Sequence, residues 1–357
     1  MPLLGIDHLE FWVGNAKQSA YYFAKAMGFS IAAYSGLETG SRDRTSYVLK
    51  QGDVTFVMTG ALTPDSEIAE HHRLHGDGVK SVNFSVPDAH RAWTEATARG
   101  AESFLEPVEV SDENGVLRTS AIKAYGETLH YFVDRQDYKG AFAPGFKALD
   151  PVPDEAGIRE IDHVVANVEL GNMEKWVGFY EDVFGMTEMI HFTDKAISTE
   201  YSALMSKVCV DGSGRVKLPI NEPADGKRKS QIEEYLDYYS GPGVQHIALA
   251  SEDIVKTVDS LRARGVQFLW VPGNYYEEAV ERVGSIDQDY KDLKRLGILV
   301  DRDDEGYLLQ IFTKPVQDRP TVFFEVIERH GSRGFGVGNF KALFEAIERE
   351  QARRGNL

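Results

Sequence analysis

The chain has 357 residues, enough for two domains that each bury a core, and its 42% hydrophobic and 27% charged residues are typical of a globular protein. A formal net charge of −17 argues against nucleic acid or an anionic membrane as a partner, because phosphate groups are bound by clustered Lys and Arg. With no apolar run long enough for a bilayer, no signal-peptide pattern and a lone cysteine, Cys209, we expect a cytoplasmic protein that handles small molecules.

The two halves of the chain repeat one pattern. The stretch "GIDHLEFWVGN" at 5–15 matches "EIDHVVANVEL" at 160–170, and a helical pattern follows each. Further on, "GVKSVNFSVPD" at 78–88 matches "GVQHIALASED" at 243–253, and each continues into a helix that ends in "ARG". Self-similarity of this kind predicts a duplicated architecture.

Each half therefore contains, twice over, a strand, a helix and several further strands, which predicts four βαββ-type modules and an α+β fold. The proline-rich segment 143–157 predicts a linker. We expect an N-terminal domain at 1–142 and a C-terminal domain at 158–357.

Three strands of the second half each turn one metal-capable side chain inward by strand alternation: His163, His246 and Glu325. A single inward histidine is more often a hydrogen-bonded core residue than a ligand, and a strand glutamate is more often paired or solvated. These three, however, occupy corresponding module positions in one half, and a lone buried carboxylate is costly unless it is paired or binds a cation.

The first half lacks this set. It has His8 at the position of His163, Ser81 at the position of His246, and roughly Phe132 at the position of Glu325. We therefore expect one metal site, in the C-terminal domain, and an N-terminal domain without metal.

Two histidines and one carboxylate can bind zinc or non-haem iron. The H-E-x-x-H motif of His₂Glu zinc hydrolases is absent from the sequence. Ligands spread over several strands favour the facial triad, which leaves positions open for a chelating substrate and dioxygen. We predict iron(II), with manganese or zinc as alternatives.

Amide and phenyl side chains are expected to reach the same interior. Asn221 lies in "VKLPINEP", Gln310 and Phe312 share a strand face in "YLLQIFTKP", and Phe323 precedes Glu325 by two residues. Any one of these phenylalanines could equally be plain core. Together they favour a pocket for an aromatic ligand with polar ends.

The C-terminal tail "GFGVGNFKALFEAIEREQ" predicts a helix. Asn339 is its expected N-cap, and an apolar stripe runs through 340–347. Two interpretations have equal support: a hinged helix that closes a pocket, or a helix simply packed on the barrel.

A further cluster, "EHHRLHGDG", contains His71, His72 and His75. Its spacing can bind metal, but its polar surroundings and the following glycine turn favour a solvated surface.

The sequence also resembles a known family. The motifs "IDHVV", "LPINEP", "KRKSQIEEYLDYYSGPGVQHIAL", "NYYEEAVERVG", "LGILVDRDDEGYLLQIFTKPVQDRPTVFFEVIERHG" and "GFGVGNFKALFEAIEREQ" resemble those of 4-hydroxyphenylpyruvate dioxygenases. The resemblance is strong from about residue 158 onward and weaker before it. It implies a vicinal-oxygen-chelate fold, in which paired βαβββ modules form an open barrel in each half, with a terminal lid helix.

The resemblance implies an Fe(II) enzyme of tyrosine and phenylalanine catabolism that converts 4-hydroxyphenylpyruvate and O2 to homogentisate and CO2. Oxidative decarboxylation, ring hydroxylation and side-chain migration are the implied chemistry. Its iron ligands fall on His163, His246 and Glu325. The implied substrate-binding residues are Ser206, Asn221, Gln231, Gln310, Phe312, Phe323, Phe335, Asn339 and Phe340, with Asn221, Gln231 and Gln310 orienting the phenol. Gln245 also matches the family, although strand alternation would point it away from His246's face.

Two other functions stay open at this point. Hydroxymandelate synthase uses the same substrate but hydroxylates the benzylic carbon; that branch lacks the Pro and Asn of "LPINEP" and has a smaller aliphatic residue at the position of Phe340, which favours ring hydroxylation here. The second is a non-catalytic protein of this fold that sequesters an aromatic acid. We also expect a homo-oligomer, a dimer or tetramer, with the first half contributing subunit contacts.

Overall fold

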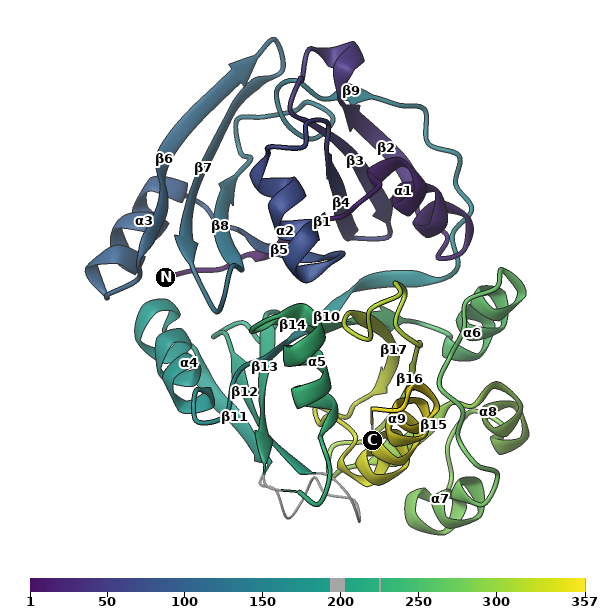
Figure 1. The fold of residues 1–357 in the computed structure, drawn as a ribbon. Helices are drawn as coiled ribbons and strands as arrows, with labels where there is room; N and C mark the ends of the chain where they lie inside the picture. The colour runs from purple at the N-terminus through teal and green to yellow at the C-terminus, as the bar shows by residue number, and fades with distance from the viewer. Residues whose placement is uncertain (193–202, 225, 357) are drawn as a thin grey trace.

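A computed structural model describes residues 1–192, 203–224 and 226–356 of the chain. Two curled sheets, one in each half, lie one above the other in Figure 1, and helices pack against each sheet. Among the described residues, no helix combines the length and the apolar character needed to cross a membrane.

The first sheet is built from the N-terminal half. Its strands are β1 (Gly5–Trp12), β2 (Ser30–Ser35), β3 (Arg44–Gln51), β4 (Val54–Ala61), β5 (Gly78–Ser85), β6 (Ser103–Asp112), β7 (Gly115–Lys123), β8 (Leu129–Asp134) and β9 (Lys147–Ala148). The helices are α1 (Ala16–Lys25), α2 (Glu67–His75) and α3 (Ala89–Ala98).

The second sheet is built from the C-terminal half. Its strands are β10 (Ile158–Asn167), β11 (Thr187–Phe192), β12 (Ala203–Val210), β13 (Lys217–Ala224), β14 (Gly243–Ser251), β15 (Leu299–Arg302), β16 (Tyr307–Phe312) and β17 (Phe323–His330). The helices are α4 (Met173–Phe179), α5 (Gln231–Tyr239), α6 (Ile254–Ala263), α7 (Tyr275–Val283), α8 (Tyr290–Leu296) and α9 (Phe340–Arg354).

The strand orders confirm the predicted duplication. The first sheet runs β6-β7-β8-β5-β1-β4-β3-β2-β9 and the second β11-β12-β13-β10-β14-β17-β16-β15. In each sheet the first strands of two modules pair antiparallel at the centre, β1 with β5 and β10 with β14. Each half is thus a pair of βαβββ modules, the vicinal-oxygen-chelate arrangement.

The helix that follows each repeated central strand begins for the same local reason. Asp88 and Asp253 stand just before α3 and α6, and each side chain accepts a hydrogen bond from a backbone N–H of the first turn. The aspartate that ends each of the two matching stretches is therefore an N-cap.

The register of the strands corrects one predicted correspondence. Ala248 of β14 pairs with Glu325 of β17, and the matching pair in the first half is Asn83 with Tyr131. Tyr131, not Phe132, therefore stands where the second half has Glu325. Side chains of neighbouring strand residues point to opposite faces, so this one-residue shift decides which residue faces the barrel interior.

One hydrophobic core runs through both halves, with Phe56 of β4 and Phe324 of β17 in ring contact across the boundary (5.9 Å between centroids). Gln51 is 1% exposed. Its Oε1 accepts hydrogen bonds from three backbone N–H groups at the start of the second half, those of Ala156, Gly157 and Ile158. Part of the predicted linker, Lys147–Ala148, forms β9 and pairs with β2 of the first sheet.

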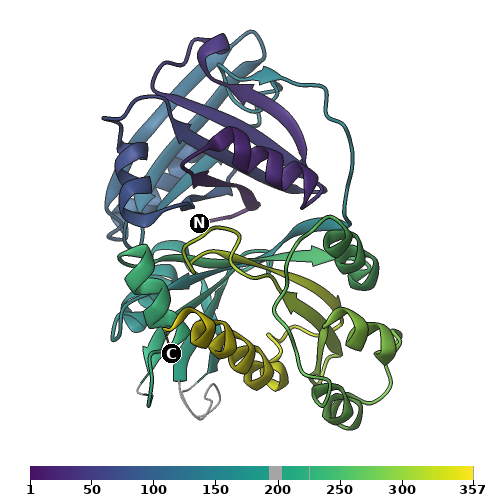
Figure 2. The ribbon, with the colours of Figure 1, turned by 45° about the vertical axis from the view of Figure 1, so that its right-hand side comes forward.

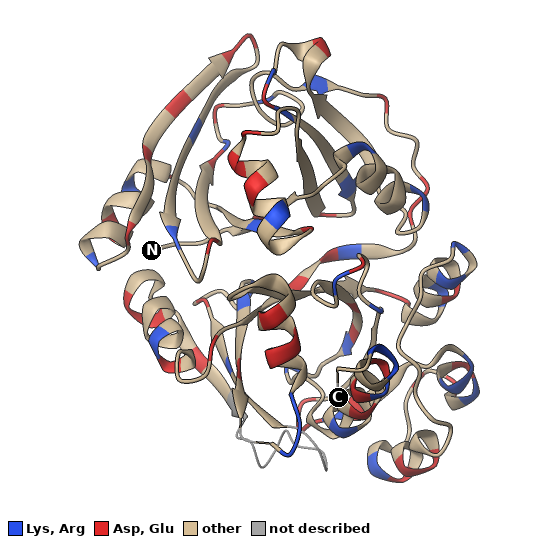
Figure 3. Ribbon diagram, viewed as in Figure 1, with Lys and Arg blue, Asp and Glu red and all other residues tan. Residues whose placement is uncertain are grey.

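Acidic and basic residues are interspersed on the ribbon of both halves (Figure 3). On α2, for example, Glu70 and Arg73 form an ion pair within one turn. Helix α9 lies against the curled sheet of the second half in both ribbon views (Figures 1 and 2).

Candidate metal centre

The three predicted ligands lie on three adjacent strands. His163 of β10 pairs with Ala248 of β14, and Ala248 pairs with Glu325 of β17, so the histidine and the carboxylate stand on either side of a small residue. His246 lies two positions earlier on the central strand, β14. Side chains two apart in a strand share a face, and this places all three on one face of the sheet.

The ligand atoms converge. Glu325 Oε2 lies 3.3 Å from His163 Nε2 and 3.5 Å from His246 Nε2. His163 and Glu325 are each 2% exposed. A divalent cation can bind between a buried carboxylate and two imidazole nitrogens in place of the protons that these groups would otherwise share.

Each imidazole is oriented by an acceptor on its outer nitrogen. His163 Nδ1 donates to Asp162 Oδ1 over 2.7 Å, and His246 Nδ1 donates to Gln245 Oε1 over 2.9 Å. Because both partners offer an oxygen acceptor, Nδ1 carries the hydrogen in each ring and Nε2 faces Glu325. Such outer partners fix the tautomer of metal-ligating histidines.

The electrostatics of the three groups are coupled. Burial acts to raise the pKa of Glu325, but His163 and His246 outweigh it and bring that pKa to about 2. Burial opposes protonation of His163, yet the negative charges of Glu325 and Asp162 raise its pKa overall, whereas burial lowers the pKa of His246. The carboxylate is thus charged, and a cation would take the place of the proton on His163.

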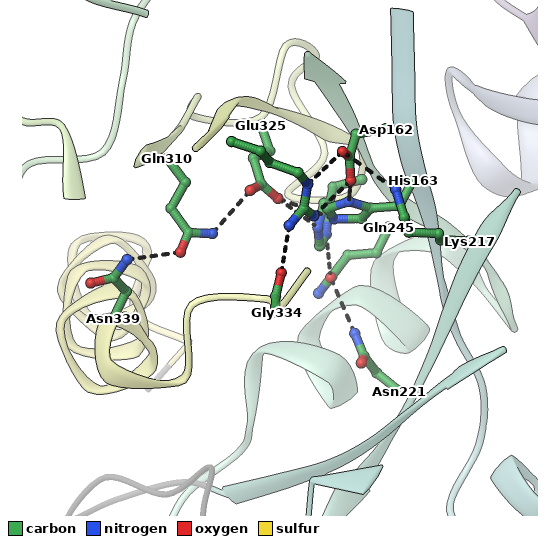
Figure 4. A network of polar contacts seen from close by, with 11 residues as sticks. Asp162, His163, Lys217, Asn221, Gln245, Gln310, Glu325, Gly334 and Asn339 are labelled. Atoms are coloured by element: carbon green, nitrogen blue, oxygen red, sulfur yellow. Dashed lines mark hydrogen bonds and ion pairs between the residues drawn. The ribbon is translucent and has the colours of Figure 1, made fainter. Parts of the chain in front are cut away.

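Asp162 links this centre to the end of β17. It accepts hydrogen bonds from Arg329 Nε at 2.7 Å and Nη2 at 2.8 Å, and Lys217 Nζ lies 3.6 Å away. Arg329 also donates to the carbonyl of Gly334 at 2.7 Å, just before the C-terminal helix. Figure 4 shows the contacts converging on Asp162 beside His163.

The donor set fits a first-row transition metal. Two neutral imidazoles and one carboxylate are the ligands of the 2-His-1-carboxylate triad, and the short N···O separations let one ion touch all three atoms. The sequence prediction of a three-residue centre in the second half therefore has a matching geometry.

A cavity of about 600 Å³, part of it open to solvent, adjoins the three residues. Its size lies in the range of small-molecule sites. Of the predicted substrate residues, it is lined by Ser206, Asn221, Gln231, Gln310, Phe312, Phe323, Phe335 and Phe340. Aromatic rings also contact the ligands directly: Phe323 stacks on His246 at 4.8 Å, and Phe335 meets His163 edge-on at 4.9 Å.

Asn339 is not among the lining residues. It stands just before α9, but its side chain does not cap the helix as the sequence had suggested. Instead it points inward, where Nδ2 donates to Gln310 Oε1 at 2.8 Å and Oδ1 accepts from the Tyr275 hydroxyl at 2.6 Å. The amide of Gln310 in turn donates to Glu325 Oε1 at 2.9 Å. Figure 4 shows this chain from Asn339 to Glu325.

Helix α9 covers one side of the cavity. Phe340, Leu343 and Phe344 line it, and Leu343 and Phe344 are buried. The apolar stripe predicted from the sequence therefore packs over the centre, whereas the hinged movement stays a prediction.

The orientation of Gln245 differs from the sequence expectation. Val165 pairs with His246 and Ala166 with Val244, which leaves Gln245 as the extra residue of a β-bulge. A bulge interrupts alternation, so Gln245 lines the same cavity as His246. Strict alternation could not have found it.

The first half repeats the outer frame of the centre without its ligands. Asp7 accepts from His8 Nδ1 at 2.6 Å and from Arg135 at 2.8 and 3.0 Å, and Phe142 meets His8 edge-on at 5.0 Å. These contacts match those of Asp162, His163, Arg329 and Phe335. Sequence reasoning missed the aspartate and the arginine, although the shared "IDH" of both halves was a signal for the aspartate.

Two family models together match most of the chain. The family model of the Glyoxalase/Bleomycin resistance protein/Dioxygenase superfamily matches residues 160–311, and that of the hydroxyphenylpyruvate dioxygenase N-terminal region matches residues 1–149. The 4-hydroxyphenylpyruvate dioxygenase of Dictyostelium discoideum is 50% identical over 99% of this chain and 100% of its own length. The chain belongs to the 4-hydroxyphenylpyruvate dioxygenase family. Another relative of that name, from Yarrowia lipolytica, is 46% identical over 99% of this chain and 93% of its own length.

The solved structure of an enzyme with another activity is also similar to this member of the 4-hydroxyphenylpyruvate dioxygenase family. A mutant of 4-hydroxymandelate synthase from Streptomyces coelicolor superposes with a TM-score of 0.88 at 34% identity, covering 98% of this chain and 100% of that one. A manganese-bound glyoxalase from Novosphingobium aromaticivorans, at 13% identity and a TM-score of 0.52 over 91% of this chain and 82% of that one, shares the fold alone.

Proposed function

We propose that this chain is an iron(II) dioxygenase that converts 4-hydroxyphenylpyruvate and O2 to homogentisate and CO2, a step of tyrosine and phenylalanine catabolism. The observation that carries the proposal is the convergence of His163, His246 and Glu325 beside a cavity lined by amides and phenyl rings. Full-length relatives named for this reaction, at 45–50% identity, support it.

Iron(II) held by these three side chains would offer open positions to the two oxygens of a 2-oxo acid and supply electrons for the reduction of O2. Asp162 and Gln245 keep the imidazole Nε2 atoms facing inward. Gln310 holds Glu325 Oε1, so that Oε2 is the oxygen left facing both histidines.

The pocket amides are proposed to orient the substrate. Asn221, 8% exposed, lies 3.5 Å from Gln245 Oε1 through its Nδ2, and Gln231 begins α5 at the cavity wall. Amides can donate to and accept from a phenol. Because both ends of the Gln310 amide are engaged by Glu325 and Asn339 in this structure, we assign Gln310 first to positioning Glu325.

The aromatic wall has two roles in the proposal. Phe312 and Phe323 offer faces for the substrate ring, and Phe335 and Phe340 close the side toward α9. These rings would limit the access of water to the bound substrate. The proposal requires that the bound substrate present to the metal centre the ring carbon that carries its side chain, so that hydroxylation occurs there.

The same site could support benzylic hydroxylation, since a 4-hydroxymandelate synthase has the same fold at 34% identity. The deciding experiment incubates the purified protein with Fe(II), ascorbate and 4-hydroxyphenylpyruvate, measures O2 uptake, and identifies the product by mass and NMR. We expect homogentisate. Hydroxymandelate as the product would show that the protein is a hydroxymandelate synthase, and absence of O2 uptake would indicate a non-catalytic binding protein.

Two variants complete this test. His246→Ala should abolish turnover and iron binding at this centre, because it removes one of its three ligands. His8→Ala, at the matching position of the first half, should keep both. Full turnover by the His246 variant would contradict the assignment of the centre.

We further propose that the chain forms a homo-oligomer through its first half. Strand β6 is an edge of the first sheet and exposes apolar side chains, with Phe104 46% and Val110 43% exposed. Light scattering of the wild type and of a Phe104→Lys, Val110→Lys variant tests this, and an unchanged mass in the variant would remove β6 from the interface.

A further inference from the structure

A second histidine cluster lies in the first half, where the sequence had suggested a solvated surface. His71 and His75 are only 2% and 3% exposed, so that expectation is wrong for both. They occupy successive turns on one face of α2, and Tyr239 of α5, from the other half, stacks on the His75 ring at 4.5 Å. Packing between the halves therefore buries a helix face whose local sequence is polar.

The carboxylate of Glu127, in the turn before β8, joins these two rings. Its Oε2 lies 3.2 Å from His71 Nδ1 and 3.4 Å from His75 Nε2. For comparison, the corresponding N···O separations at Glu325 are 3.3 and 3.5 Å. Ligand bonds of about 2.0–2.1 Å in a tetrahedral zinc site put neighbouring ligand atoms about 3.3 Å apart.

The orientation of His75 leaves one ring nitrogen available. Its Nδ1 donates to the backbone carbonyl of Tyr239, so Nε2 carries the lone pair. This Nε2 is buried and makes no hydrogen bond to any described residue. Three further buried polar atoms are likewise without a partner among the described residues: His71 Nε2, Trp12 Nε1 on β1, whose ring meets that of His71 at 5.3 Å, and Thr128 Oγ1 beside Glu127.

We propose that His71, His75 and Glu127 bind a divalent transition metal ion of the zinc class. Two histidines four residues apart on a helix with a carboxylate from a loop are a recurrent zinc-binding arrangement. Glu127, with its side chain 48% exposed, leaves room for solvent to complete the coordination. Since His75 also holds the Tyr239 carbonyl, the ion would fasten α2 to α5 and thus one half to the other.

Lys80 competes for the same carboxylate. Its Nζ lies 3.5 Å from Glu127 Oε2 and 4.6 Å from the centre of a Trp12 ring. If the cluster were only an ion-pair network, Lys80 would be its cation and no metal would be needed. Removing the lysine therefore separates the two possibilities: a metal site binds its ion more tightly, and an ion-pair network binds none.

The experiment uses the full-length His246→Ala variant, in which the candidate iron centre has lost a ligand. The metal-stripped protein is titrated with Co(II), and binding is followed by the visible absorption that tetrahedral Co(II) gives. We expect one bound Co(II) per chain, and Lys80→Met added to this background should lower the Kd. Absence of binding to both proteins would overturn the proposal.

Ligand identity is tested in the same background. Adding His75→Ala should weaken Co(II) binding by more than about 100-fold. Loss of a residue that only hydrogen-bonds to a metal ligand costs about 100-fold at most. Adding His72→Ala is the matched control, because that side chain is 45% exposed on the same helix and should leave binding unchanged. Unaltered binding in the His75 variant would overturn the assignment. If that variant fails to fold by circular dichroism, Glu127→Gln gives the same readout, and none of these results depends on dioxygenase activity.

Discussion

Arg329 of β17 holds Asp162 of β10 by two hydrogen bonds, of 2.7 and 2.8 Å. Asp162 lies directly before His163 and accepts the hydrogen of its Nδ1. Through Asp162, Arg329 thereby fixes the orientation of His163, although these two bonds do not join Arg329 to any candidate ligand. The same guanidinium binds the Gly334 carbonyl, so the segment before α9 is tied to the metal centre.

We expect Arg329→Lys to weaken metal binding by about 10- to 100-fold, the usual cost of losing an outer partner of a ligand. A lysine ammonium cannot make the paired contact that a guanidinium makes with a carboxylate. The Kd for Fe(II) or Co(II) measures the effect.

Arg135→Lys is the matched control, because Arg135 makes the same pair of bonds to Asp7 in the half without the triad. Metal affinity should be unchanged in this variant, although it loses stability. Equal loss of metal affinity in both variants would show that the arginines act only through global stability.

Asp7 provides a prediction on pH. Burial acts to raise the pKa of Asp7, but hydrogen bonds from His8 and Arg135 outweigh burial and lower it. The charged carboxylate therefore stabilises the fold above its unfolded pKa of about 4, and this contribution is lost as the pH falls below that value toward the folded pKa.

Asp7→Asn should thus lower the free energy of unfolding at pH 7 by about 2 kcal/mol. The difference from the wild type should shrink as the pH is lowered below about 4. Urea unfolding at a series of pH values measures both. A difference that does not change with pH would mean that the charge of Asp7 is not responsible.

Gly336 lies beside Gln310, with a φ of +72° that favours glycine. A Cβ at this position would collide with Gln310 Oε1. We expect Gly336→Ala to displace the Gln310 amide and to lower kcat/KM by about 100-fold, since small displacements of positioning groups are costly.

Gly178→Ala is the control for that substitution. Gly178 lies in α4, a Cβ there has nothing within 4 Å, and alanine is the better helix former. O2 uptake should be unchanged in this variant. If Gly336→Ala also left uptake unchanged, the Asn339–Gln310–Glu325 chain would have no role in catalysis.

Gln51 tests the junction between the halves. Its Oε1 accepts from three backbone N–H groups at 2.7, 3.2 and 3.3 Å, and its Nε2 donates to the Met27 carbonyl at 2.8 Å. Gln51→Ala leaves these buried groups without partners and should lower the free energy of unfolding by about 3 kcal/mol. An unfolding curve equal to that of the wild type would refute the role of this side chain.

The duplication and the three candidate ligands could be predicted from the sequence because they depend on residue identity at repeated positions. His163, His246 and Glu325 stand out where one half departs from the other, and strand alternation then places them on one face. The apolar stripe of the C-terminal helix follows from the helical period in the same way.

Only the tertiary structure decided the orientations that depend on register and on packing between distant segments. Gln245 faces the cavity because a bulge breaks alternation, and Tyr131 rather than Phe132 matches Glu325 because β5 and β8 pair in that register. His71 and His75 are buried because α5, more than 150 residues further along, covers a helix face that looks polar by itself. Local pattern reports which residues can face inward, but burial is set by what the rest of the chain brings against them.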